Sequence, residues 1–237
     1  MKAYFGVGDG HTAKRILAGH GAMISHAYIG SSWVKHTEFE DLLDLCSGVT
    51  IDSGAFTAWN KGTPLNDEQI EKYLEFVRKY RDRIHWAVTV DVIGDAEASL
   101  KRWRATQDLD VDLVPVWHEG DPIEHLREYD PSSRLVCLGR IEGRQSKPCT
   151  LAFYDAAFNA FPDGRFHALG NASPDTLEPY PFASFDAVSW QRNAAYAQKH
   201  GWPWSACSRD TRMVAYIEAI ETIDHRPRKH AQLRFEI

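Results

Sequence analysis

Acidic side chains end or interrupt three of the short β-rich segments of this chain. Asp52 follows the run GVTI, Asp91 follows WAVTV, and Asp186 stands inside SFDAVSW between apolar neighbours. A carboxylate in an apolar strand must be paired, hydrogen-bonded or shifted in pKa. Two or three carboxylates that face one cavity suit a reaction through a positively charged, sugar-like transition state, because one can attack or stabilise the anomeric carbon while another moves protons.

Each of these residues also has a purely structural interpretation. Asp52, which precedes Ser53 and a glycine, could cap a turn, and Asp91 could cap the helix expected shortly after it. His118, which follows the next β-rich run, could be a solvated loop histidine. Asp186 is the hardest to explain structurally, because the residues on both sides of it are apolar. We therefore favour a functional role for Asp186 even without the others.

Histidine and cysteine offer a weaker signal for a metal site. The chain has four cysteines, at positions 46, 137, 149 and 207. None of them has the C-x-x-C spacing typical of zinc sites, and His11 and His20 are nine residues apart rather than four. Cys207 with His225 and His230 is a looser set. We expect reduced thiols and no cofactor, with zinc near Cys207 as the alternative.

Composition excludes several classes of protein. The chain carries 27 Lys and Arg against 33 Asp and Glu, a net charge of −6, which excludes a generally basic nucleic-acid coat but not a local basic face. Its hydrophobic fraction of 43% is ordinary for a globular protein with a substantial core. No run of about 18 apolar residues occurs, and the N-terminal MKAYFGVGDGHT does not resemble a signal peptide. We expect a cytoplasmic protein that does not enter a membrane.

Short β-rich runs alternate with helical patterns along the chain. The expected strands are residues 2–7, 22–29, 48–54, 84–92, 112–117, 134–139, 165–170 and 184–190. The expected helices are residues 11–19, 38–46, 67–82, 95–108, 122–129, 148–160, 174–180, 191–199 and 209–223. Eight alternating units predict a parallel sheet closed into a (β/α)8 TIM barrel, a single α/β domain over residues 1–237. The helices within 191–223 would close the barrel, and 224–237 would form a tail.

An open, doubly wound sheet is the structural alternative. Its usual phosphate signal is G-x-G-x-x-G, and GVGDGHT at 6–12 matches only half of it. A barrel places its active site at the C-terminal ends of its strands, and polar residues gather at those positions. They are Asp52, Ser53, Asp91, Trp117, His118, Glu119, Gly139, Arg140, Glu142, Gly170, Asn171, Asp186, Arg192 and Asn193.

Four segments together resemble one enzyme family. IDSGAF at 51–56 resembles the T-D-S-G-G-F-Q segment of queuine/archaeosine tRNA-guanine transglycosylases, and HALGNASPDTLEPYPFASFDAVSWQRN at 167–193 resembles their M-G-x-G-x-P-E-D-L…D-x-F-D-C-V-x-P-T-R-N stretch. VTVDV at 88–92 and CLGRIEG at 137–143 resemble two further strands of the family. The four matches occur in family order and cover most of residues 48–193. The family fold is a (β/α)8 barrel, in agreement with the alternation.

The resemblance implies a base exchange on a nucleic acid. Asp186 would be the nucleophile that attacks the sugar C1′ and expels guanine, which leaves a covalent glycosyl-enzyme intermediate. Asp52 would be the general acid and base, protonating the departing guanine and deprotonating the incoming 7-deazaguanine. Asp91 would read the Watson–Crick edge of the base, and the target nucleotide must leave its stack to reach the pocket.

The resemblance also implies a base pocket around these carboxylates. Ser53 and Gly139 would add hydrogen bonds, and Phe56 would stack on the base. His118 lies near the position of the family's base-binding glutamine, although a gap is needed to align them. Arg140 replaces a second glycine of the family at the pocket rim. Gly170 completes the expected substrate-binding residues.

Departures from the family pattern favour DNA over tRNA as the substrate. Ala55 replaces a glycine, and the zinc pattern C-x-C-x-x-C with a later histidine is absent. A compact barrel without that subdomain is similar to the DNA-modifying branch, whose members insert 7-deazaguanine derivatives into DNA and are often phage-encoded. We expect a DNA-guanine transglycosylase, with the same exchange on tRNA as the alternative. A homodimer is possible, as in the tRNA relatives.

Phosphate contacts should be confined to one part of an acidic protein. Arg140, Arg144 and Lys147 follow a strand end, and Arg192 follows the last strand, so these four would rim the predicted barrel mouth. The sequence leaves two other functions open. One is a barrel glycosidase that uses Asp52 and Asp186, and the other is a non-catalytic nucleic-acid-binding barrel.

Overall fold

The computed structural model describes the chain except for residues 108, 110–112, 141–145, 189, 196–205 and 227–237. Within the described residues nine strands occur: β1 (Lys2–Gly6), β2 (Gly21–Ser25), β3 (Gly48–Asp52), β4 (Trp86–Val88), β5 (Leu113–Val114), β6 (Val116–His118), β7 (Leu135–Gly139), β8 (Arg165–Ala168) and β9 (Ser184–Ala187). All of their pairings are parallel, in the order β5-β4-β3-β2-β1-β9-β8-β7-β6.

The first and last strands of this order are two halves of one predicted strand. β5 and β6 are consecutive in the chain and are separated only by Pro115. Proline has no N–H to donate to a ladder, so the run expected at 112–117 divides there. One half pairs with β4 and the other with β7, which brings the ring nearly to closure. The prediction of a (β/α)8 barrel is confirmed.

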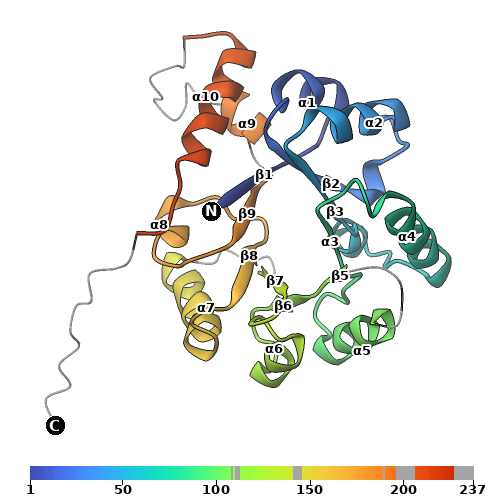
Figure 1. Cartoon of the computed structure of the whole chain (residues 1–237), viewed down its shortest axis with the longest axis vertical. Helices are drawn as coiled ribbons and strands as arrows, with labels where there is room; N and C mark the ends of the chain where they lie inside the picture. The colour runs from blue at the N-terminus through green and yellow to red at the C-terminus, as the bar shows by residue number, and fades with distance from the viewer. Residues whose placement is uncertain (108, 110–112, 141–145, 189, 196–205, 227–237) are drawn as a thin grey trace, which may run out of the picture.

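Helices surround this ring of strands (Figure 1). They are α1 (Gly10–Ile16), α2 (His36–Leu45), α3 (Ala55–Asn60), α4 (Asp67–Tyr80), α5 (Ala96–Thr106), α6 (Ile123–Tyr129), α7 (Lys147–Ala160), α8 (Pro174–Leu177), α9 (Trp190–Ala195) and α10 (Arg209–Glu221). The helix at 55–60 was not expected, and it begins directly after Gly54, whose φ of 83° turns the chain out of β3. No helix of the described residues is long and apolar enough to cross a bilayer.

Capping residues set where two of the helices begin. Asn66 accepts from the Gln69 N–H while the Gln69 side chain accepts from the Asn66 N–H, so α4 begins with a capping box at Asn66. Asp95 accepts from the Ala98 N–H and caps α5. Asp91 therefore does not cap this helix, and its carboxylate is available for another role.

Side-chain alternation along the strands divides the core into two parts. Tyr4, Met23 and Cys137 pack inside the barrel, whereas Phe5 and Phe166 pack between the strands and the helices. β4 ends at Val88, earlier than the expected 92, so Asp91 lies in the loop beyond the strand. The predicted tail lies, from residue 227 on, outside the described residues.

Candidate active site

The register of the strands directs Asp52 and Asp186 into the barrel. Asp186 pairs laterally with Tyr4, which packs inside the barrel, and paired residues of neighbouring strands share a face. Thr50 pairs in the same way with the interior Met23. Asp52 comes two residues after Thr50, so its side chain also faces inward at the C-terminal end of β3.

Asp186 is held in a fixed position by two donors. Its side chain lies on a wall of the barrel with only 1% of the residue exposed. The N–H of Gly170 lies 2.5 Å from Oδ1, and Nε2 of His167 lies 3.2 Å from the same oxygen. Gly170 has a φ of 68°, a conformation that favours glycine and turns its N–H toward the carboxylate. Gly170, expected to bind substrate, is thus a partner of the predicted nucleophile.

His167 is a site residue that the sequence analysis missed. It is fully buried in β8, and Nδ1 lies 2.8 Å from the Ser184 hydroxyl. With Nε2 donating to the Asp186 carboxylate, Nδ1 can accept from the Ser184 hydroxyl. The rings of Tyr4 and Trp86 pack against it, the latter at 4.8 Å between centroids. A histidine that alternates with Phe166 in an apolar strand was the available signal, because it has the inward parity of the barrel residues.

Asp52 has the perturbed acidity of a proton-transfer group. Burial raises the pKa of its carboxyl to about 6, and the charges of Asp91 and Asp186 add to the rise. The Gly54 N–H, 3.1 Å from Oδ2, opposes this shift. Near neutral pH this carboxyl therefore exists in both its protonated and its ionised form.

Asp91 forms a second buried pair, with His118. Nε2 of His118 lies 3.1 Å from Asp91 Oδ2, and Nδ1 lies 3.8 Å from Asp121 Oδ2. The His118 backbone N–H also donates to Asp121, at 2.9 Å. Burial lowers the pKa of His118, but the hydrogen bond to Asp91 and the charges of both carboxylates outweigh it, so the pKa is raised. His118 is thus a buried, paired residue rather than a solvated loop histidine.

The charges of all three carboxylates affect the pKa of the buried Cys137 thiol. Burial raises the pKa of this thiol well above its usual value, and the charges of Asp186, Asp52 and Asp91 raise it further. Cys137 lies in the barrel interior on β7, so the three carboxylates surround one region at the end of the barrel. The structure thus brings together the three acidic residues that the sequence singles out.

The other predicted pocket residues have identifiable structural partners. The Ser53 hydroxyl accepts from the Ala55 N–H at 3.3 Å, and the Phe56 ring stacks on Trp59. Gly139 lies beside His118 in the ladder, where a Cβ would come within 2.9 Å of the imidazole. A glycine is therefore required at 139 for the His118 ring to occupy its place.

The predicted basic rim is partly neutralised. Lys147 pairs with Asp175 at 2.9 Å, and Nε of Arg140 lies 4.0 Å from a Glu119 oxygen. Arg192 is exposed on α9. Arg144, like Glu142, lies outside the described residues. The two ion pairs reduce the charge that this side of the mouth offers to phosphates.

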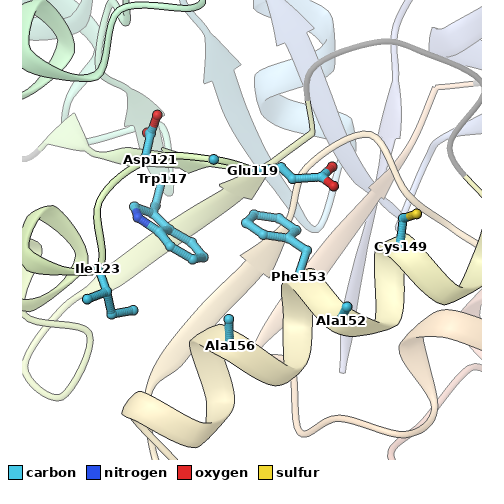
Figure 2. A pocket seen from close by; sticks show the side chains of 9 residues that line it. Trp117, Glu119, Asp121, Ile123, Cys149, Ala152, Phe153 and Ala156 are labelled. Carbon is cyan, nitrogen blue, oxygen red and sulfur yellow. The ribbon is translucent and has the colours of Figure 1, made fainter.

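A groove of about 540 Å³ lies outside the barrel wall, between the β6–α6 connection and α7 (Figure 2). Its lining residues are Trp117, Glu119, Gly120, Asp121, Ile123, Cys149, Ala152, Phe153 and Ala156. Trp117 stacks on Phe153 with ring centroids 5.0 Å apart. Because Trp117 and His118 are consecutive in β6, they project to opposite sides of the strand, and Asp52, Asp91 and Asp186 do not line the groove, although Asp121, which contacts His118, does.

Two of the three alternative zinc residues, Cys207 and His225, lie among the described residues. Cys207 is exposed, and His225 Nδ1 lies 3.1 Å from the Glu178 carbonyl oxygen. His230 lies outside the described residues. Among those that are described, no group of three His, Cys, Asp or Glu side chains is arranged to hold a metal ion.

Neither a protein-family model nor a curated protein sequence matches this chain. Among solved structures, it is similar to the crystal structure of 2,3-dimethylmalate lyase, a member of the PEP mutase/isocitrate lyase superfamily. The TM-score is 0.48 at 12% sequence identity, and the match covers 93% of this chain and 92% of that chain. The barrel assignment rests on the strand order of this chain itself.

Proposed function

We propose that this protein is an enzyme that exchanges guanine in DNA for a 7-deazaguanine through a covalent intermediate on Asp186. One observation carries the proposal. Asp186 is buried and held by two donors, while Asp52, whose pKa is influenced by the charge of Asp186, has that pKa raised to about 6. A carboxylate held in place by donors and a carboxyl group with a raised pKa can divide the roles of nucleophile and proton carrier.

The first half-reaction breaks the bond between the sugar and guanine. Within the described residues both hydrogen bonds to Asp186 reach Oδ1, so Oδ2 is the oxygen that attacks C1′. The C1′–N9 bond breaks, its electron pair stays on guanine, and protonated Asp52 gives its proton to the leaving base. An ester between Asp186 and the sugar remains.

The second half-reaction reverses these roles with a new base. Ionised Asp52 accepts the N9 proton of a 7-deazaguanine, and that nitrogen attacks C1′ and releases the Asp186 carboxylate. Asp91, paired with His118, accepts hydrogen bonds from the Watson–Crick edge of the base, as the family resemblance implies. His118, with its raised pKa, fixes the orientation of this carboxylate.

Exchange is tested by digesting nucleic acid after incubation with the protein and 7-deazaguanine bases, and by a denaturing gel for a protein–DNA adduct. DNA and tRNA are offered separately. We expect 7-deazaguanine deoxynucleosides from DNA, an adduct with the wild type, and neither product with Asp186→Ala. The matched control is Asp163→Ala, because Asp163 is exposed in the turn that precedes β8, at the other end of the barrel.

Three results would overturn the proposal. Exchange that survives Asp186→Ala would contradict the covalent mechanism. Modified tRNA without modified DNA would reassign the substrate. No exchange in either nucleic acid, with several 7-deazaguanines supplied, would leave another barrel reaction of Asp52 and Asp186, such as glycoside hydrolysis, as the function to test.

A further inference from the structure

Some of the exposed large apolar side chains lie at one side of the barrel mouth. Among the described residues the exposed large apolar side chains are Trp33, Leu45, Trp59, Val188 and Val214. Three of them, Trp33, Trp59 and Val188, follow the C-terminal ends of β2, β3 and β9. In the sheet these strands are contiguous, in the order β3-β2-β1-β9. The same arc carries Asp52 at one end and Asp186 at the other.

Two loops of this arc present aromatic rings to solvent. Trp33 is 58% exposed and lies 6.4 Å from the Tyr28 ring, and Trp59 is 39% exposed. The Trp59 ring stacks on Phe56 with centroids 5.9 Å apart and 28° between the planes. Exposed indole rings offer flat apolar faces on which an aromatic partner can stack. We call residues 26–37 and 53–66 the aromatic mouth loops.

The charge of the aromatic mouth loops differs from that of the whole chain. Neither segment contains Asp or Glu, although the chain has a net charge of −6. Lys35 and Lys61 are exposed in them. On the opposite arc, by contrast, Lys147 pairs with Asp175. The aromatic mouth loops therefore favour an anionic partner that also has flat apolar faces.

These loops adjoin the candidate catalytic carboxylate directly. Ser25, which ends β2, pairs with Asp52 across the sheet, and Gly54 donates its N–H to Asp52. A Cβ at Gly54 would lie 3.0 Å from the Ala27 Cβ, so the two loops touch at their bases. Helix α3, which carries Phe56 and Trp59, lies nearer the centre of the ring than α4 or α5 (Figure 1).

We propose that the aromatic mouth loops bind an unpaired DNA strand, whose bases stack on Trp33 and Trp59 and whose phosphates contact Lys35 and Lys61. The substrate of the site is then single-stranded DNA rather than duplex. Bases in a duplex have both faces covered by their neighbours, whereas unpaired bases offer a face to an indole. The choice of DNA rests on the proposed function; the stacking surface rests on the exposed rings and the charge around them.

Binding is measured by fluorescence anisotropy with a labelled 12-nucleotide DNA strand, the same sequence as duplex, and the same sequence as RNA. We expect the DNA strand to bind at least about 10-fold more tightly than the duplex. Trp59→Ala and Trp33→Ala should each weaken strand binding by about 10-fold and duplex binding little. Trp59→Tyr should keep most of the affinity, whereas Trp59→Leu, apolar but not aromatic, should lose it. Leu45→Ala is the control for an exposed apolar residue outside these loops.

Equal binding of strand and duplex, or tryptophan variants that bind as the wild type does, would overturn the proposal. Tighter binding of the RNA strand than of DNA would overturn the choice of DNA. The measurement needs no 7-deazaguanine and is repeated with Asp186→Asn, so it does not depend on exchange. Stacking without exchange would leave only the proposed chemistry wrong, and exchange on duplex with unaffected tryptophan variants would leave only the stacking wrong.

Discussion

Two buried imidazole–carboxylate pairs lie in the barrel, and they differ in the group beside the second ring nitrogen of the histidine. His167 pairs with Asp186 and meets a neutral hydroxyl, Ser184, at its other nitrogen. His118 pairs with Asp91 and has a second carboxylate near its other nitrogen. The strand order places β9 and β4 on opposite walls of the ring.

The neighbour decides what each pair can do. The Ser184 hydroxyl can donate to Nδ1 of His167, which leaves Nε2 to donate to Asp186. Two carboxylates favour the imidazolium, and the pKa of His118 is raised despite burial. The same two residue types thus produce a carboxylate held by a neutral hydroxyl–imidazole pair on one wall and a histidine with a raised pKa between two carboxylates on the other.

The largest difference in kcat/KM is expected between the variants that replace the carboxylate of one pair or of the other. Asp186→Asn should lower kcat/KM roughly 10⁴-fold or more, the scale of losing a covalent nucleophile. Asp91→Asn should lower it about 100-fold, the scale of charged hydrogen bonds to the base, and should still form the adduct on a denaturing gel. Loss of the adduct in Asp91→Asn would show that both pairs, and not only that of Asp186, are needed to form the covalent intermediate.

Asp52→Asn should have the next largest effect on activity, because the charges of both Asp91 and Asp186 act on its carboxyl. We expect a loss of about 10²–10⁴-fold in kcat and disappearance of the wild-type pH limb near 6.

The same substitution should change stability in a pH-dependent way. The folded-state pKa of Asp52 is raised, so its protonated form stabilises the fold below the unfolded pKa, and that stability is lost as the pH rises through about 6. At pH 8 the Asn variant should therefore be more stable than the wild type by on the order of 2 kcal/mol, and at pH 4 the two should unfold alike. Equal denaturation midpoints at both pH values would contradict the shift.

Substitution of His167 should remove the hydrogen bond from its ring to Asp186 while Asp186 itself remains. His167→Ala removes a donor to Asp186 and should lower kcat by up to about 100-fold with little change in KM. It also leaves a buried cavity and unpaired groups, at a cost of about 2–4 kcal/mol in urea unfolding. His167→Gln, which retains a donor, should recover part of both losses. A Gln variant no more active than Ala would mean that the ring only fills space.

His118→Gln should have a smaller effect, about 10-fold in kcat/KM, because glutamine keeps a hydrogen bond to Asp91 but not the charge. The folded-state pKa of His118 is raised, so its stabilising contribution is complete below the unfolded pKa and is lost as the pH rises through the folded value. The stability difference between wild type and variant should thus shrink from pH 6 to pH 9. The exposed His11→Gln serves as control, and a constant difference would contradict the pairing.

The smallest effect is expected at Lys147, whose charge is met by Asp175 at the exposed end of α7. Lys147→Ala should change DNA affinity by less than about 2-fold, since exposed ion pairs contribute little. Asp175→Ala should strengthen DNA binding, because it releases the lysine charge. A large loss of affinity in Lys147→Ala would restore this residue to the phosphate-binding rim.

The barrel could be predicted because each strand and helix carries its own local signal. The run at 84–92 is rich in β-branched residues, yet only Trp86–Val88 pair in the sheet, since strand ends depend on neighbours that the local pattern does not contain. Pro115 was visible in the sequence, but its effect is to divide a strand at the point where the ring closes.

The site could be predicted in its residues but less so in its partners. Asp52, Asp91, His118 and Asp186 follow from strand ends and the family resemblance. The pairing of His118 with Asp91 depends on two strands that meet only in the folded barrel. Lys147 finds Asp175 for the same reason, 28 residues further along the chain. Such partners are properties of the closed ring rather than of any single segment.

The buried thiol of Cys137 can report how often the barrel opens. Its thiol is fully buried on the inner face of β7, and its raised pKa leaves almost no thiolate at neutral pH. A thiol reagent can reach it only while the wall of strands is parted. In a chain that retains Cys137 as its single cysteine, the rate of thiol labelling would therefore report how often the barrel opens. The difference between the rates with and without a bound base would report how strongly the base stabilises the closed barrel.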